Sequence, residues 1–357
     1  MPVTTPHPDY SDALQRWETV RDAAKGEEAI KKRDLGSTSG TVNSTGVTYN
    51  RRYLPDFDPP DPVRYVKYVQ RAYFLGVTGR TRDALTGMIF RKPPETELPD
   101  ALAALLDNAD GAGQSMEQLA KAAASDLMEL GRYGLLVDFP ASDPGRTAED
   151  ETRDQLRPVL APYRAESIIN WKTKRFGGTE KLTLLVLHEQ RDKDDDDYEH
   201  NKEDVYRELA LRDGVYVQTL YNQRGQVLEQ FTPRMAGGAP FEHIPFYIVG
   251  AQDNRPDVDE SPLLDLAVLN IAHYRNVADL EEACFITGQP TLHVDAGEAN
   301  AADFAAANEN GFTLGSRKGI VTQKGRIELV QAEERGLLPN EIERKEQRMV
   351  RRGARLI

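Results

Sequence analysis

Carboxylates gathered in the segment 192–204 are the residues best placed to do chemistry. At relative positions 1, 3, 5 and 12 they imitate the oxygen ligands of a calcium-binding loop: Asp192, Asp194, Asp196 and Glu203. The sixth position of such a loop requires glycine for its turn, and here it is Asp197. The segment therefore favours a solvated acidic hairpin tip, and a metal-dependent hydrolase or nuclease that uses residues 192–204 is the alternative.

Histidines near residue 188 and the cysteine at 284 could be reactive, but their sequence surroundings do not fit a metal site or a nucleophile. His188 and Glu189, with His200 nearby, lie in a segment typical of a strand, and a zinc-protease helix would need histidine where Asp192 stands. Cys284 falls on the apolar side of a predicted helix, so we expect a buried thiol. Since no nucleophile is grouped with a base and an oxyanion donor, the sequence predicts that the protein is not an enzyme and has no catalytic residue, metal or cofactor.

Composition limits the classes of protein that remain. The chain has 357 residues, with 58 acidic and 45 basic side chains, and a formal charge of −13. Such a chain is poorly suited to hold nucleic acid tightly, because phosphate binding needs clustered lysine and arginine. One cysteine excludes an intrachain disulfide and multi-cysteine metal sites. No apolar run approaches the roughly 18 residues of a membrane helix, and residues 1–30 lack the pattern of a signal peptide.

The elements that must position these residues begin with an arm over residues 1–62. A short helix is predicted over 11–24, and a segment rich in glycine, serine and threonine follows at 36–48. This segment buries too little apolar area to fold alone, so we expect it to be mobile or to order on a neighbouring chain.

A helical region is predicted over residues 63–157. A helix is expected over 63–89, with Gly76 and Gly79 as weak points that could bend it. A second helix over 115–130 begins at Ser115 as its N-cap and ends at Gly131.

Residues 158–260 have β character. Apolar runs at 205–211 and 215–220 flank Asp213-Gly214, which is a strong hairpin signal. We expect the resulting meander to be closed by a proline-interrupted edge strand over 240–249.

The last part of the chain is dominated by a long helix over residues 261–288. Ser261 is expected to be its N-cap, and Gly288 to end it. A polar return with short strands, one of them near 327–330, is predicted over 289–338, and a final helix begins at 339–357.

Short motifs that follow one another along almost the whole chain indicate a protein family, which the patterns above do not. They include His7-Pro8-x-Tyr10, Tyr53-Leu54-Pro55, Leu85-Thr86-Gly87-Met88-Ile89-Phe90-Arg91-Lys92-Pro93, Gly131-Arg132-x-Gly134, Tyr163-x-Ala165-Glu166, Pro262-Leu263-Leu264-Asp265 and Pro290-Thr291-Leu292. Together they resemble a subfamily of tailed-bacteriophage portal (head–tail connector) proteins that is catalogued as a domain of unknown function.

The resemblance implies an α+β, phage-portal-like fold with a helical and β wing, a β-rich clip and a long stem helix. It implies a ring of roughly a dozen copies at a capsid vertex, which is the conduit for DNA packaging and ejection and the docking site for terminase and tail adaptor. Further implied partners are the major capsid and scaffolding proteins, and double-stranded DNA that passes without sequence-specific binding. The implied location is the virion, after assembly in the host bacterial cytoplasm, with no membrane partner. A scaffold or adaptor that forms no closed ring is a further alternative.

The resemblance also assigns roles to residues. The stem helix 261–288 would line the channel. Acidic side chains there would let DNA slide, because only lysine and arginine bind its phosphates and hold it in place. The alternative for these carboxylates is an ordinary solvated helix face. The family normally continues beyond the final helix into a helical crown that is absent here. The candidates are Asp265, Asp279 and Glu282 for the channel, Glu333, Glu334 and Arg335 for a tunnel loop, and Tyr10, Trp17 and Tyr53 for an inter-subunit arm.

Overall fold

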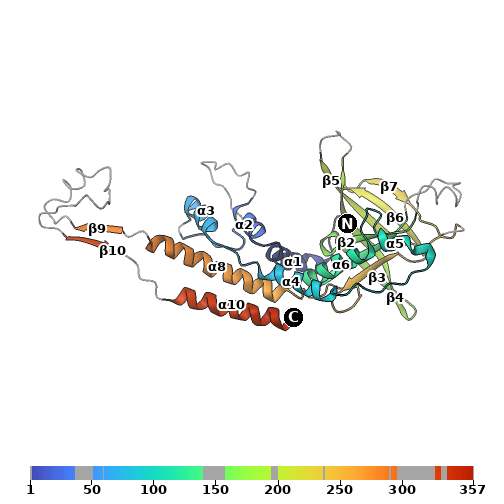
Figure 1. The fold of residues 1–357 in the computed structure, drawn as a ribbon. Coiled ribbons are helices and arrows are strands. Elements are labelled where there is room, and N and C mark those ends of the chain that lie inside the picture. The colour runs from blue at the N-terminus through green and yellow to red at the C-terminus, as the bar shows by residue number, and fades with distance from the viewer. Residues whose placement is uncertain are drawn as a thin grey trace. The chain divides into compact units, whose positions relative to one another are not determined.

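The computed structural model is a mixed helix and sheet structure, which confirms the predicted α+β class (Figure 1). Within the described residues, no helix is long and apolar enough to cross a membrane. The structure describes residues 2–36, 51–58, 60–139, 157–193, 200–235, 238–288, 291–295, 326–330 and 336–356.

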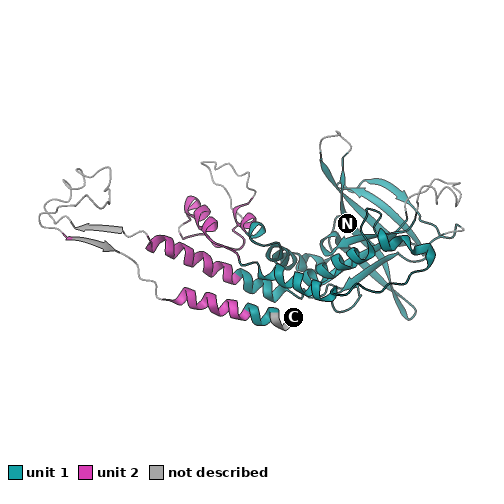
Figure 2. Ribbon diagram, in the orientation of Figure 1, with its two compact units in different colours: residues 1–30, 75–271, 349–357 teal, residues 31–74, 272–348 magenta. Residues whose placement is uncertain are grey.

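Contacts divide the chain into two units, coloured separately in Figure 2. Unit 1 holds Met1–Ile30, Leu75–Ile271 and Met349–Ile357, and unit 2 holds Lys31–Phe74 and Ala272–Arg348. The first thirty residues belong to the same unit as the helices and strands that follow residue 75.

The helices of the described chain have clear starts and stops. The predicted second helix is confirmed as α6, where the Ser115 side chain accepts from the backbone N–H of Gln118 in a capping box, and Gly131 ends the helix at a φ of 75°. The helices are α1 (Pro8–Lys25), α2 (Glu27–Leu35), α3 (Pro62–Arg71), α4 (Val77–Ile89), α5 (Ala104–Asp107), α6 (Met116–Leu130), α8 (Leu264–Thr287) and α10 (Leu337–Leu356), with 3-10 turns η1 (Asp100–Leu102) and η2 (Ala165–Ser167).

The helix predicted over 63–89 is two helices, and the break lies just before Gly76, one of the two predicted weak points. The chain leaves helix α3 at Ala72, whose ψ of 145° is extended, and re-enters a helix only after Gly76. The two helices serve different units: α3 buries tyrosines in unit 2, whereas α4 packs against α1 and α6 in unit 1. Gly79 of α4 approaches α1 so closely that a Cβ there would lie 2.4 Å from the carbonyl oxygen of Ala24.

A five-stranded antiparallel meander has the order β3-β4-β5-β6-β7. The predicted hairpin is confirmed: Arg212 pairs with Val215 across Asp213 and Gly214, whose φ angles of 52° and 82° fit a type I′ turn. The strands are β3 (Ile168–Phe176), β4 (Thr179–Asp192), β5 (Lys202–Arg212), β6 (Val215–Asn222) and β7 (Val227–Phe231).

A second sheet in unit 1 has the order β2-β1-β8, with β1 (Arg132–Asp138), β2 (Val159–Arg164) and β8 (Phe246–Gly250). The expected closing strand is therefore an edge strand, but it pairs with β1 and does not close the meander, so that part of the prediction is wrong. The cause is burial. Phe246 and Ile248 join one core with Leu185 and Leu209 of the meander.

The long helix starts later than predicted, at Leu264. Ser261 is not its N-cap, because the Ser261 hydroxyl donates to the backbone carbonyl of Glu129. Beyond α8, the antiparallel strands β9 (Thr291–Asp295) and β10 (Arg326–Val330) pair only with each other among the described strands. The strand predicted near 327–330 is thereby confirmed.

Candidate functional site

Helices α8 and α10 contact each other within each unit (Figure 1). In unit 1, Arg352 lies 3.1 Å from Asp265, whose side chain is 84% exposed. In unit 2, the buried His273 places Nε2 3.2 Å from Glu346. Burial lowers the pKa of His273, so this imidazole is neutral near pH 7.

The other two predicted channel carboxylates are engaged inside unit 2. Asp279 accepts a hydrogen bond from the Tyr68 hydroxyl at 2.6 Å, and burial followed by this bond raises the pKa of Tyr68. Glu282 is only 7% exposed and lies between Arg64, at 2.8 Å, and Arg71. Two arginines therefore neutralise Glu282 within the chain, and its place on a channel stays a prediction.

A buried carboxylate that the sequence did not single out organises the start of unit 2. Asp34 accepts from the backbone N–H groups of Tyr53, at 2.6 Å, and Leu54, at 3.2 Å. Burial raises the pKa of Asp34 to about 6 despite these bonds. Arg275 Nε donates to the Tyr53 carbonyl at 2.7 Å. Tyr53 is 3% exposed within its own chain, and its place on an inter-subunit arm stays a prediction.

The other two arm candidates are also internal, in unit 1. Trp17 is 1% exposed and meets Tyr10 edge-on, with ring centroids 5.7 Å apart. The Tyr10 hydroxyl donates to the Glu166 carbonyl at 3.0 Å. The apolar stripe of α1 is buried against α4 and α6 within unit 1, and the arm role of Tyr10 and Trp17 stays a prediction.

An ion network built on Arg21 ties α1 to α6, α4 and the turn before β3. Arg21 Nε donates to Glu166 at 2.7 Å, and Nη1 contacts both Asp126 and Glu129. Arg82 of α4 also pairs with Glu129. Burial raises the pKa of Asp126, whereas the bond and charge of Arg21 outweigh burial at Glu166 and lower its pKa. No sequence signal marks this network, because its members are up to 145 residues apart.

The acidic segment forms a strand pair where it is described. Asp192 pairs with Lys202 across β4 and β5, and Glu203 is held by Arg191. His188 lies 3.0 Å from Asp204. Hydrogen bonds from Gln190 and then from His188 lower the pKa of Asp204. Asp194, Asp196 and Asp197 lie outside the described residues. Among the residues that are described, no three metal-ligating side chains gather into a group.

Cys284 corrects a further prediction, because its side chain is exposed. Cys284 lies in the last turn of α8, where Phe285 and Ile286 are exposed as well. The tunnel-loop candidates Glu333, Glu334 and Arg335 lie outside the described residues, as does the segment predicted to be mobile beyond Gly36.

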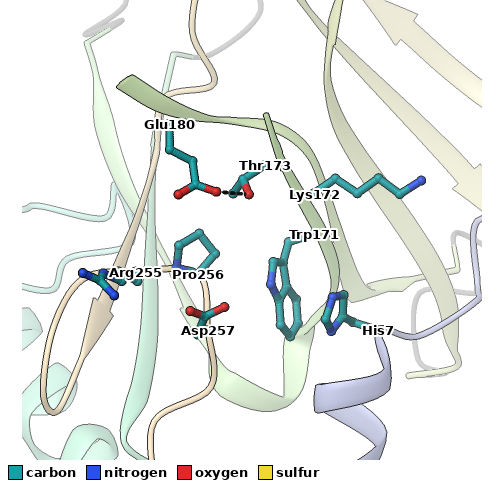
Figure 3. Close-up of a pocket in the computed structure, with 8 residues that line it drawn as sticks. All are labelled: His7, Trp171, Lys172, Thr173, Glu180, Arg255, Pro256 and Asp257. Carbon is teal, nitrogen blue, oxygen red and sulfur yellow. Dashed lines mark hydrogen bonds between the residues drawn. The ribbon is translucent and has the colours of Figure 1, made fainter. Parts of the chain in front are cut away.

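A cavity of about 290 Å³ opens in unit 1 beside Trp171 (Figure 3). His7 stacks on one indole face at 4.0 Å, and the guanidinium of Arg132 lies 3.9 Å from the ring centroid. Arg132 is fully buried, and burial lowers its pKa to about 10. The cavity has mixed charge, and the Thr173 hydroxyl in it donates to Glu180 at 2.5 Å. The lining residues are His7, Trp171, Lys172, Thr173, Glu180, Arg255, Pro256 and Asp257.

Comparison with known proteins gives a family match over part of the chain. Residues 262–357, which hold α8 and α10, match a family described as a domain of unknown function, DUF4055. No curated protein matches.

Two solved chains are similar at low identity. A chain in "Virion of native gene transfer agent (GTA) particle" is 13% identical at a TM-score of 0.40, with 81% of this chain and 66% of that chain covered. A chain in "Neck of empty GTA particle computed with C6 symmetry" is 14% identical at a TM-score of 0.41, with 91% of this chain and 73% of that chain covered. Likenesses at this level assign neither a fold family nor a function.

Proposed function

We propose that this chain is the subunit of a portal ring, a non-enzymatic structural component of a bacteriophage head–tail junction. The observation that carries the proposal is the helix pair α8 and α10. Helix α8 has 24 residues, about 36 Å at 1.5 Å per residue, and spans the positions where the sequence resemblance places a stem helix. Helix α10 returns beside it, held by the Arg352–Asp265 and His273–Glu346 contacts.

In this proposal the β9–β10 ribbon, which the chain inserts between the two helices, takes the place of the clip. The strands of residues 158–260 share one hydrophobic core with β1 and β8, so they are part of the body of unit 1. The ribbon, in contrast, pairs only with itself among the described strands. In this proposal the β9–β10 ribbon, which connects the two helices, contacts another protein at the end of the stem.

The proposed ring serves as a conduit for double-stranded DNA and as a platform for terminase, tail adaptor, capsid and scaffolding proteins, within the virion. The net charge of −13 supports passage of DNA over its retention, because a chain with an excess of carboxylates repels the phosphate backbone. Asp265 supplies an exposed carboxylate on α8 that fits this requirement.

Native mass spectrometry of the purified chain, paired with negative-stain images, tests the proposal. A closed ring of roughly a dozen copies with a central channel is the expected result. A monomer or dimer at every salt concentration would contradict it, and an assembly without closure would favour an adaptor or scaffold. A nuclease assay on the same sample, with and without divalent cations, is expected to show no cleavage of duplex DNA.

A further inference from the structure

Arg132, the first residue of β1, is a fully buried cation in unit 1. No described residue accepts a hydrogen bond from its Nε, Nη1 or Nη2. Its guanidinium carbon lies 3.9 Å from the ring centroid of Trp171, which is itself only 4% exposed. Because an arginine keeps its proton at neutral pH, a positive charge with unused N–H donors lies inside the protein.

The indole ring satisfies this charge only in part. A cation over an aromatic face is attracted by the ring, but the N–H donors of a guanidinium point outward in its own plane, away from that contact. Leaving such donors buried without an acceptor costs free energy. Two parallel N–H donors match the two oxygens of a carboxylate or a phosphate, so the free edge of Arg132 is suited to an oxyanion.

The carboxylates around Arg132 act on it without bonding to it. Asp257 opposes the burial that lowers the pKa of Arg132 more strongly than Asp9 and Asp259 do. Asp259 is already engaged, because it accepts from the backbone N–H of Gln252 at 2.8 Å. Asp257 is exposed and makes no hydrogen bond or ion pair with another residue in the described ranges.

The cavity of about 290 Å³ adjoins Arg132, because Trp171 and Asp257 both line it (Figure 3). Its volume is several times the roughly 30 Å³ of a water molecule, which is enough for an oxyanion and a small attached group. Asp257 reaches the cavity from the tip of a loop that is held at its base. There, the N–H of Ala251 donates to the carbonyl of Gly131 at 3.0 Å, and the bond between Gln252 and Asp259 closes the loop.

We propose that Arg132 anchors a binding site for an oxyanion, a carboxylate or a phosphate group, in the cavity beside Trp171. Arg132 has no exposed surface, so the loop tip that carries Asp257 moves aside when the oxyanion binds. Asp257 competes with the ligand, because its carboxylate is attracted by the same guanidinium. Every residue of this site belongs to unit 1, and the inference does not depend on the proposed ring.

Tryptophan fluorescence of the purified chain tests for binding, because Trp171 is one of two tryptophans and borders the site. Inorganic phosphate is titrated in one arm and acetate in the other, with sodium chloride holding the ionic strength constant so that screening of surface charges does not change. A saturable change is expected in at least one arm. The arm with the lower dissociation constant identifies the group as a phosphate or a carboxylate.

Two substitutions test the roles of the residues. Asp257→Asn removes the competing charge and is expected to tighten binding about tenfold. Arg132→Lys keeps the positive charge without the paired donors and is expected to weaken binding at least about tenfold. The control is Asp253→Asn, which removes the same charge from the same loop at a residue that contacts Arg255, and it is expected to leave the affinity within about twofold.

Each other outcome overturns the inference. Equal affinity of the parent chain and Arg132→Lys would mean an adventitious ion only, bound by surface cations. No saturable change in either the parent chain or Asp257→Asn would mean that Arg132 is satisfied within its own chain. If Arg132→Lys does not fold, the comparison of Asp257→Asn with Asp253→Asn decides, and equal affinities of these two variants would contradict the proposed competition.

Discussion

At the scale of single residues, buried charged side chains link segments that are distant in the sequence. Arg21 and Arg82 converge on Glu129 in unit 1, and Arg64 and Arg71 converge on Glu282 in unit 2. Buried ion pairs of this kind add little to the free energy of unfolding compared with a well-packed apolar replacement. Removing one partner lowers that free energy strongly, because the remaining charge stays buried without a countercharge.

Glu129→Gln is expected to destabilise unit 1 by about 3 kcal/mol, because two arginines lose their shared countercharge inside the protein. Urea unfolding followed by circular dichroism measures the change. Glu229→Gln, on the exposed strand β7, is the control and is expected to stay within about 0.5 kcal/mol of the parent chain. Equal stability of the two variants would show that the Arg21 network does not hold the helices.

Asp34 gives unit 2 a pH dependence of opposite sign to that of a salt-bridged carboxylate. Its folded-state pKa is raised from 3.8 to about 6, so the folded chain holds this proton more tightly than the unfolded chain. The stability that this confers is present at about pH 4 and is lost as the pH rises through about 6. Since the carboxyl group is fully buried, the loss is roughly 3 kcal/mol.

Asp34→Asn isolates this contribution, because the amide oxygen still accepts from the N–H groups of Tyr53 and Leu54 without a charge. The free energy of unfolding of the variant, relative to the parent chain, is expected to rise between pH 4 and pH 7. A constant difference across that range would mean that Asp34 titrates at its ordinary value.

At the scale of elements, close approach decides which glycines are required. Within helix α4, Gly79 lies against the backbone of Ala24, whereas a Cβ on Gly87 would meet nothing within 4 Å. The same substitution should therefore have opposite effects at two positions of one helix.

Gly87→Ala is expected to stabilise the chain by about 0.5–1 kcal/mol, the usual gain for alanine inside a helix. Gly79→Ala is expected to destabilise it, because the new methyl group would lie 2.4 Å from the Ala24 carbonyl oxygen and α4 would have to move away from α1. Thermal unfolding of both variants checks the pair. A gain in both would mean that α4 does not pack against α1 as described.

At the scale of the whole molecule, the N-terminal residues are part of a folded unit. Residues 1–30 belong to unit 1, and α1 buries Ala13, Trp17 and Val20. The effect of removing them is therefore expected to appear in folding before it appears in assembly.

Deleting residues 1–30 is expected to abolish cooperative unfolding of unit 1, because the deletion removes a core tryptophan and the Arg21 network together. Near-UV circular dichroism and a denaturant titration measure this. Deleting only residues 2–6, which precede α1, is the milder control. A truncated chain that unfolds cooperatively, yet fails to assemble, would support the prediction of an inter-subunit arm.

The amino-acid sequence by itself determined the features that depend on neighbours a few residues away. The Ser115 cap, the stop at Gly131 and the Asp213-Gly214 hairpin were all predicted, because side-chain caps and positive φ angles act locally. The α+β class followed from the periodicity of apolar residues in the same way.

Only the tertiary structure decided which segments meet. The pairing of β8 with β1, the break between α3 and α4, and the exposure of Cys284 depend on which surfaces cover one another. The partners of Arg21 and Glu282 lie more than 100 residues away in sequence, and a charge has no local signature that names its distant partner. Burial is a property of the folded chain as a whole, and it overrode the local patterns at each of these points.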